Sequence, residues 1–259
     1  MKKLFFPAIL MFVFAGLACS GCKDDDPVTG TGTTNLVFKA TYNNEPFVGY
    51  KNFDFLDGNQ VFFNLFQFFI SDVELLRADG TAQKLVDVDF VNLTFTDNAA
   101  ALAGKTITAT NIPEGKYTGL RLGIGVKPSL NGTNPNTLPD SNPLTVNGRG
   151  EFWSGWKSYI FMKIEGKYDA NGDGAAFEQP LLYHCGSDAV YRTLTFTQPI
   201  EVAKNGTASV TISTDIAKIL RENGQPFNLV AEPATSDDPT DVTVATKLMN
   251  NLQDAIKMQ

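Results

Sequence analysis

The sequence has very little of the residues that most catalytic and metal sites use. It contains one histidine and three cysteines among 259 residues. A Ser/His/Asp arrangement has only His184 to draw on, and no Gly-x-Ser-x-Gly elbow, phosphate-binding loop or dinucleotide fingerprint is present. These absences argue against a hydrolase and predict a protein that is not an enzyme.

Basic residues are also few and scattered. Lysine and arginine number 21 against 28 acidic residues, which gives a net charge of −7, and no basic cluster is present. Nucleic acids and anionic lipid surfaces are bound through concentrated positive charge. The composition therefore predicts that nucleic acid is not a partner.

The first 26 residues indicate export from the cytoplasm. Lys2 and Lys3 precede an apolar run over residues 4–17, and small residues then lead to Cys22. A positive tip, an apolar segment of about 7–15 residues and a small-residue exit are typical of a secretory signal peptide. A membrane-spanning helix needs roughly 20 apolar residues. We therefore predict a signal peptide over residues 1–21.

Cys22 resembles the lipidated first residue of bacterial lipoproteins. The polar chain starts directly after it, which favours Cys22 over Cys19 as the lipid anchor. The following Lys-Asp-Asp-Asp resembles the export signal of surface lipoproteins of Bacteroidetes, although it also suits an ordinary acidic tether. The resemblance implies an outer-membrane lipoprotein that is exposed at the cell surface, with a periplasm-facing position as the alternative.

A short tether and one domain account for the rest of the chain. Residues 22–34 are rich in Asp, Gly and Thr and predict a flexible acidic tether. Residues 35–259 then form one domain of a size normal for a β-sandwich. With Cys19 removed and Cys22 lipidated, Cys185 is the only remaining thiol. The core must therefore be held by packing, without an intramolecular disulfide.

The hydrophobic pattern predicts an all-β domain. Short runs of period two or of continuous apolar residues alternate with turn residues, as in residues 36–42. Residues 61–76 are apolar on both alternating sets, which is expected of a central strand or strand pair. Asn205-Gly206 predicts a hairpin that pairs residues 200–203 with 208–213. We expect an antiparallel immunoglobulin-like or Greek-key β-sandwich.

Helices are expected only near the C-terminus. Thr214 or Asp215 can cap a short helix over residues 216–222. Residues 242–258 carry apolar side chains at four-residue spacing, which predicts an amphipathic helix that packs on the sandwich.

The segment Lys127–Arg149 has a different composition. It contains four prolines and five asparagines and has no sustained period. Loops longer than about 15 residues in a compact domain are usually functional or disordered. Because it leads directly into the aromatic stretch described next, it is a candidate lid or wall of a site.

Both tryptophans lie in the stretch 151–166 (EFWSGWKSYIFMKIEG), and His184-Cys185-Gly186 follows downstream. The stretch resembles the W-x-x-W, aromatic-rich, Ile-Glu-Gly strand of MbnP-like proteins, a copper-binding family associated with methanobactin operons. Weaker resemblances occur in family order over roughly residues 36–213. They are Phe68–Leu75, Ile112–Tyr117, Ile124–Val126 and His184-x-Gly186.

This resemblance implies a surface β-sandwich that holds or delivers a copper ion. Its expected ligands are His184 and one of Trp153 and Trp156, oxidised to kynurenine by a di-haem peroxidase-like partner. Relatives use more than one histidine, whereas this chain has only His184. The alternative is therefore a metal-free structural or partner-binding surface module in which both tryptophans serve packing.

A calcium loop is a second possible metal site. Asp169, Asn171 and Asp173 follow the spacing of the first half of such a loop, in which alternate oxygen atoms wrap a cation. The twelfth position, where a bidentate acid belongs, is Pro180, and Glu178 lies two places early. A polar turn after a strand is the alternative interpretation.

The lipid anchor gives a direct prediction. Cys22→Ala should release the protein from the membrane fraction, because the lipid would have no attachment point. Cell fractionation with immunoblotting measures this, and Cys19→Ala serves as the matched control, which should stay with the membranes. Membrane retention of the Cys22 variant would contradict the assignment.

Overall fold

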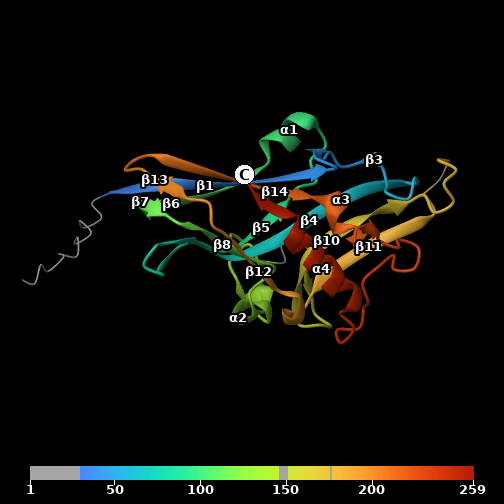
Figure 1. Cartoon of the computed structure of the whole chain (residues 1–259). Helices are drawn as coiled ribbons and strands as arrows, with labels where there is room; N and C mark the ends of the chain where they lie inside the picture. The colour runs from blue at the N-terminus through green and yellow to red at the C-terminus, as the bar shows by residue number, and fades with distance from the viewer. Residues whose placement is uncertain (1–29, 146–150, 176) are drawn as a thin grey trace, which may run out of the picture.

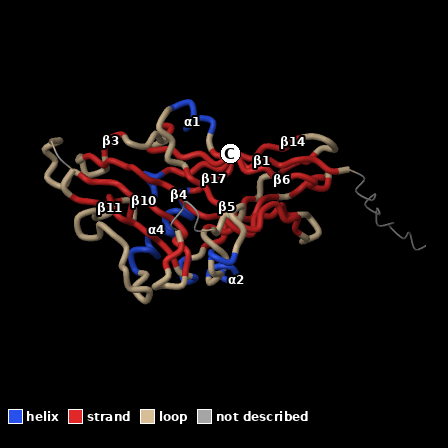
Figure 2. Tube along the Cα trace, turned by 180° about the vertical axis from the view of Figure 1, so that it is seen from behind, coloured by secondary structure: helices blue, strands red, loops and turns tan. Residues whose placement is uncertain are grey.

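The computed structural model describes residues 30–145, 151–175 and 177–259. The predicted signal peptide and lipid anchor Cys22 lie outside these ranges, as do residues 146–149 of the predicted long loop. Two β-sheets face each other across one core, and helices lie at their margins (Figure 1 and Figure 2). The predicted all-β sandwich is therefore confirmed.

Strand β1 lies at the centre of the smaller sheet. It pairs with β14 in parallel and with β2 and β6 in antiparallel fashion, and β17 extends the sheet beyond β14. The strands of this sheet are β1 (Thr31–Tyr42), β2 (Glu45–Pro46), β6 (Lys105–Pro113), β14 (Thr207–Asp215) and β17 (Ile256–Met258).

The larger sheet is built around β4, which pairs with four other strands. Its order is β11-β10-β4-β8-β12, with β3 and β5 also on β4 and β9 on β10. These strands are β3 (Lys51–Asp54), β4 (Gln60–Leu76), β5 (Ala82–Asn92), β8 (Gly119–Ile124), β9 (Phe152–Trp153), β10 (Ser158–Tyr168), β11 (Gln179–Gly186) and β12 (Arg192–Phe196).

Short elements complete the described fold. Two small pairs are β7 (Gly115–Tyr117) with β13 (Ile200–Val202), and β15 (Arg221–Glu222) with β16 (Gln225–Pro226). The α-helices are α1 (Asn98–Ala103), α2 (Pro128–Asn131), α3 (Ile216–Ile219) and α4 (Thr243–Ala255), and the 3₁₀ turns are η1 (Pro135–Thr137) and η2 (Asp188–Val190).

The domain starts earlier than the sequence pattern predicts. Strand β1 begins at Thr31, and Thr34 is fully buried between its neighbours. The predicted tether over residues 22–34 is therefore too long, and the predicted domain boundary at residue 35 is four residues late. The threonines suit a pleated strand, and hydrogen bonding to β6 and β14 holds them there.

The prediction of a purely antiparallel fold with an Asn205-Gly206 hairpin is wrong in one place. The turn itself forms, with Asn205 at φ 55° and the Gly206 N–H donating to Ala203 O at 2.9 Å. The Gly206 carbonyl, however, accepts from Thr33 N, which places β14 beside β1 in parallel. Strand β13 pairs with β7 instead.

The C-terminal helix is confirmed with a shorter span. Helix α4 ends at Ala255, because residues 256–258 join the smaller sheet as β17. Asp215, one of the two predicted caps, caps α3 by accepting from Ala217 N, but this helix ends at Ile219 and residues 221–222 form β15. Helices α1 and α2 were not predicted. In the described ranges, no helix combines the length and apolar character needed to cross a bilayer.

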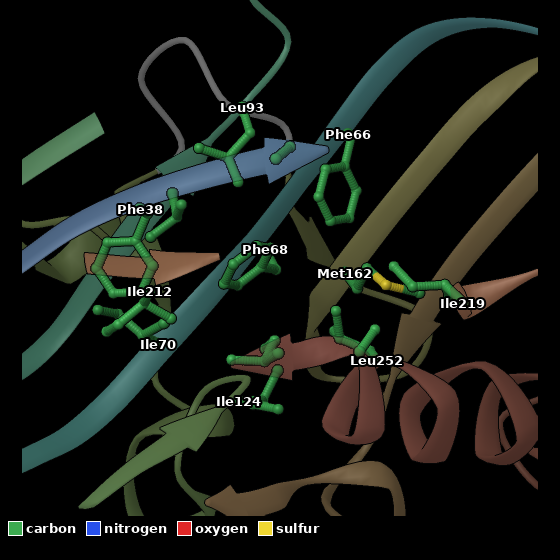
Figure 3. Packing of buried hydrophobic residues seen from close by; sticks show 14 of the residues in the cluster. Phe38, Phe66, Phe68, Ile70, Leu93, Ile124, Met162, Ile212, Ile219 and Leu252 are labelled. Carbon is green, nitrogen blue, oxygen red and sulfur yellow. The ribbon is translucent and has the colours of Figure 1, made fainter. Parts of the chain in front are cut away.

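The long strand β4 is apolar on both alternating sets because both of its faces are buried. Register shifts lie near Phe63 and near Val73, and Asp72 at the second has φ 47°. Between them, Phe66, Phe68 and Ile70 enter the core that the two sheets share (Figure 3). The sequence left open a central strand or a strand pair, and β4 is one central strand.

The opposite face of β4 carries a second apolar cluster. Phe69 is buried there and its ring lies 4.9 Å from that of Phe90 and 5.9 Å from that of Tyr159. The Tyr159 hydroxyl donates to Leu144 O at 2.9 Å. The described part of the long loop, residues 127–145, therefore covers this face.

Helix α4 closes one side of the core, and its packing can be tested. Leu252 is fully buried and points toward the cluster that holds Met162 and Ile124 (Figure 3). Leu252→Ala should lower the free energy of unfolding by about 2–5 kcal/mol, measured by chemical denaturation. Leu102→Ala, at a side chain that is 50% exposed, should change it by less than about 0.5 kcal/mol. Equal effects of the two changes would contradict the packing.

Candidate functional site

A row of polar side chains crosses the outer face of the larger sheet. His184 of β11 lies opposite Lys163 of β10, Lys163 lies opposite Gln67 of β4, and Gln67 lies opposite Asn92 of β5. Directly opposed residues project to the same face of a sheet. The predicted copper ligand His184 is therefore at the end of this row, next to the edge of the sheet.

His184 is held by two hydrogen-bonding partners. Its Nε2 lies 2.8 Å from Glu165 Oε1, and both side chains are about a quarter exposed. Its backbone N–H donates to Thr235 Oγ1 at 2.9 Å, and the Thr235 hydroxyl donates to the His184 carbonyl at 3.1 Å. The imidazole is therefore fixed in place and still reachable from solvent.

Cys185 does not belong to this site. It is fully buried among core residues on the opposite side of β11, and it is a free thiol. Burial raises the pKa of this thiol far above its usual value. The register irregularity between β10 and β11 lies at Ile160–Met162, so it does not turn Cys185 toward His184. A His184/Cys185 chelate is excluded.

Trp153 and Trp156 form a stacked pair at the turn between β9 and β10. Their ring centroids are 4.8 Å apart and their planes differ by 5°. The turn requires φ 52° at Lys157, and the Trp156 Nε1–H donates to Asp237 O at 2.8 Å. Both indoles are half-buried, so one side of the pair stays accessible.

Trp156 and His184 occupy neighbouring positions on one face. A Cβ placed on Gly186 would lie 3.5 Å from Trp156 Cζ3, so the indole lies against the backbone at Gly186. His184 and Gly186 are two residues apart on β11, roughly 7 Å along a strand. Among the described ring contacts, none joins an indole directly to the imidazole. The structure thus places Trp156 against the strand that carries His184, and Trp153 stacks on Trp156.

The long loop forms walls on both sides of the tryptophan turn. A hollow of about 180 Å³ lies on one side and another of about 530 Å³ on the other, and Lys157 lines both. Asn131 is buried beside the first, where its Nδ2 donates to Asp188 Oδ1 at 2.8 Å and its Oδ1 accepts from Tyr159 N. Residues 131–136 of the long loop thus line the two hollows, and its role as the wall of a site stays a prediction.

The predicted calcium loop brings three carboxylates together at the far end of β10. Ligand atoms of Asp169, Asp173 and Glu178 lie within 4.8 Å of one another. Asp169 is buried and accepts from Gly172 N and Gly174 N, both at 2.9 Å. Asn171 donates through Nδ2 to Glu178 at 3.0 Å, so its amide nitrogen is turned toward the acids. The arrangement can hold a cation through carboxylate oxygen atoms.

The MbnP family model matches residues 31–240 of this chain. The chain belongs to the MbnP family. Its fold is similar to that of MbnP from Methylosinus trichosporium, with a TM-score of 0.52, 14% sequence identity, and coverage of 83% of this chain and 87% of that one. The comparison with curated proteins gave no match.

Glu165 is the site residue of this MbnP member that sequence reasoning did not single out. It lies in the Ile-Glu-Gly motif that carried the resemblance, but the motif gives no reason to pair it with His184. The signal is the register of β10 with β11, in which Lys163 lies opposite His184 and Glu165 lies one alternation away. The diagonal pair of Glu165 and His184 forms only because β10 and β11 are neighbours in the sheet, which the sequence motif does not indicate.

The burial of Cys185 gives a chemical prediction. In the folded chain Cys185 should resist alkylation by iodoacetamide at mildly alkaline pH, because burial denies access and disfavours the thiolate. It should react fully after unfolding in guanidinium chloride. Mass spectrometry of the chain from Lys23 onward measures both states, and complete labelling of the native protein would contradict this placement.

Proposed function

We propose that this MbnP family member is a lipid-anchored binding protein that holds or delivers one copper ion at His184, and that it is not an enzyme. The observation that carries the proposal is the fixed and solvent-accessible imidazole of His184, bound to Glu165 at 2.8 Å and next to the stacked tryptophans. Imidazole is a suitable copper ligand, and copper stands at the top of the divalent affinity order.

Glu165 gives this imidazole a defined tautomer. A carboxylate only accepts hydrogen bonds, so in the neutral imidazole Nε2 carries the proton and Nδ1 keeps its lone pair. Metal-binding histidines commonly donate their second N–H to a carboxylate, which orients the ring and raises the basicity of the ligand nitrogen. The residues present therefore fit a copper site in which His184 is the ligand and Glu165 orients it.

The tryptophan pair is the proposed source of a further ligand. Oxidation of an indole to kynurenine opens the ring and produces an aniline nitrogen that can coordinate a metal. Both indoles are half-buried at a turn on the molecular surface, which supports access by a partner of the di-haem peroxidase type. Trp156 lies against Gly186, near His184, and is the better placed of the two.

The proposed location is the outer membrane, with the domain displayed at the cell surface. Cys22 would carry the lipid, and the first strand begins at Thr31. The eight residues 23–30 span at most roughly 28 Å. This length supports a domain held close to the membrane surface.

Calcium is the proposed ion for the acidic loop. The loop offers carboxylate oxygen atoms from Asp169, Asp173 and Glu178. Hard cations such as calcium prefer oxygen ligands, whereas imidazole suits copper. A calcium titration followed by thermal unfolding tests this site, and Asp169→Asn should reduce any stabilisation because it removes the buried charge.

Copper titration tests the main proposal. The chain from Lys23 to Gln259 should bind copper with one-to-one saturation, and His184→Ala should abolish this binding. Glu165→Gln should weaken it by roughly 10–100-fold, since the ring loses its orienting carboxylate. Isothermal titration calorimetry measures the affinity, and mass spectrometry of the tryptic peptide with Trp153 and Trp156 detects kynurenine in protein from the native host.

The matched control is Leu182→Ala, which changes an exposed residue two positions from His184 on the same strand. This variant should bind copper like the wild type. Absence of saturable binding by the wild type, together with unmodified tryptophans, would overturn the copper proposal in favour of a metal-free partner-binding module.

A further inference from the structure

We propose that Lys163 and Gln67 become joined by an intramolecular isopeptide bond, with Glu151 as the proton-transferring group. Lys163 of β10 and Gln67 of β4 are directly opposed in the larger sheet. Opposed residues have Cβ atoms about 4.5–5.5 Å apart and project to the same face. An amine and a carboxamide are thus held next to each other by the backbone pairing of two neighbouring strands.

Glu151 connects the two reacting groups. Its Oε2 lies 2.8 Å from Lys163 Nζ, and its Oε1 accepts from Gln67 Nε2 at 2.7 Å. One carboxylate therefore contacts both the nitrogen that would attack and the nitrogen that would leave. This is the position of a group that takes a proton from one and delivers it to the other.

The three side chains are shielded from water. Glu151 and Gln67 are each 5% exposed, and the side chain of Lys163 is 12% exposed. Burial keeps water from competing with the amine and strengthens the electrostatic effects within the site. An ion pair also loses much of its hydration in such a place, so conversion to neutral groups is favourable.

Asn92 completes the arrangement from the next strand. It lies opposite Gln67 on β5, and its Nδ2 donates to Gln67 Oε1 at 3.4 Å. A donor on the carbonyl oxygen stabilises the negative charge that develops there during attack by the amine. Nucleophile, acid–base group, electrophile and oxyanion donor thus lie together on one face.

The reaction balances without an external reagent. Glu151 removes a proton from the Lys163 ammonium group, and the free Nζ attacks Gln67 Cδ. Glu151 then delivers this proton to Nε2, the Cδ–Nε2 bond breaks, and Glu151 takes the second proton from Nζ. One Nζ–Cδ amide bond forms, ammonia leaves, and Glu151 remains protonated. The site has no net charge before or after.

The proposal predicts a measurable loss of mass. The chain from Lys23 to Gln259, which retains every described residue, should be lighter than its sequence by one ammonia after denaturation. Proteolysis should yield one branched peptide that joins the segments containing Gln67 and Lys163. Lys163→Arg and Glu151→Gln should each show the full sequence mass. Thermal unfolding midpoints should fall in both variants, because the bond closes a long loop.

Two controls make the result decisive. Lys167→Arg, on the same strand at an exposed position, should still lose ammonia and form the branched peptide. Asn-Gly pairs such as Asn205-Gly206 can also lose ammonia by succinimide formation, but that loss would persist in Lys163→Arg. Full mass in the wild type, or an ammonia loss in the wild type without the branched peptide, would overturn the proposal.

Discussion

The structure depends on the requirement that one strand, β4, be buried on both faces. It pairs with β3, β5, β8 and β10 and contributes side chains to the main core and to the cluster under the long loop. A strand with solvent on one face alternates between apolar and polar residues. Strand β4 has no solvated face along most of its length, so its sequence does not alternate in this way. Between its two register shifts the strand alternates regularly, so Phe66 and Phe68 enter the core while Gln67 and Phe69 face the other way. The sheet that carries the candidate site is ordered around this strand.

The same strand sets the position of the polar row. Gln67 is polar between two buried phenylalanines, and the row from His184 through Lys163 to Asn92 crosses the sheet at its level. Beyond Gln67 on β4, Phe69 is covered by Tyr159, which the loop holds through Leu144 O. The loop and the tryptophan turn therefore lie beside the row, near Phe69 and Gly186, and the chain near Thr235 lies along the sheet edge at His184. A site at this place results from packing around β4.

Much of this could be predicted from the sequence, and the failures have physical causes. Strands and the α4 region follow from local periodicity, and Asp215 caps α3 through its own side chain. The partner of β14 could not be predicted, because an Asn-Gly turn determines local chain reversal and leaves the choice of neighbour to the core. Glu165 was not predicted, and Glu178 was judged to lie two places too early in the calcium loop, for a related reason. Each meets its partner through strand order or a loop that folds back, which spacing along the chain does not encode.

The polar row also explains how a copper ion at His184 would tolerate a lysine in the opposing position. Two like charges about 5 Å apart repel by about 3 kcal/mol at an effective dielectric constant of 20. Lys163 lies opposite His184 on the neighbouring strand, and its charge is balanced by Glu151 at 2.8 Å. Glu165 adds a negative charge beside the imidazole. If the Lys163 side chain forms the proposed amide bond with Gln67, Lys163 carries no charge and Glu151 is protonated, so this pair is neutral as well. In both states Glu165 leaves the surroundings of His184 with a net negative charge, which would attract a cation there.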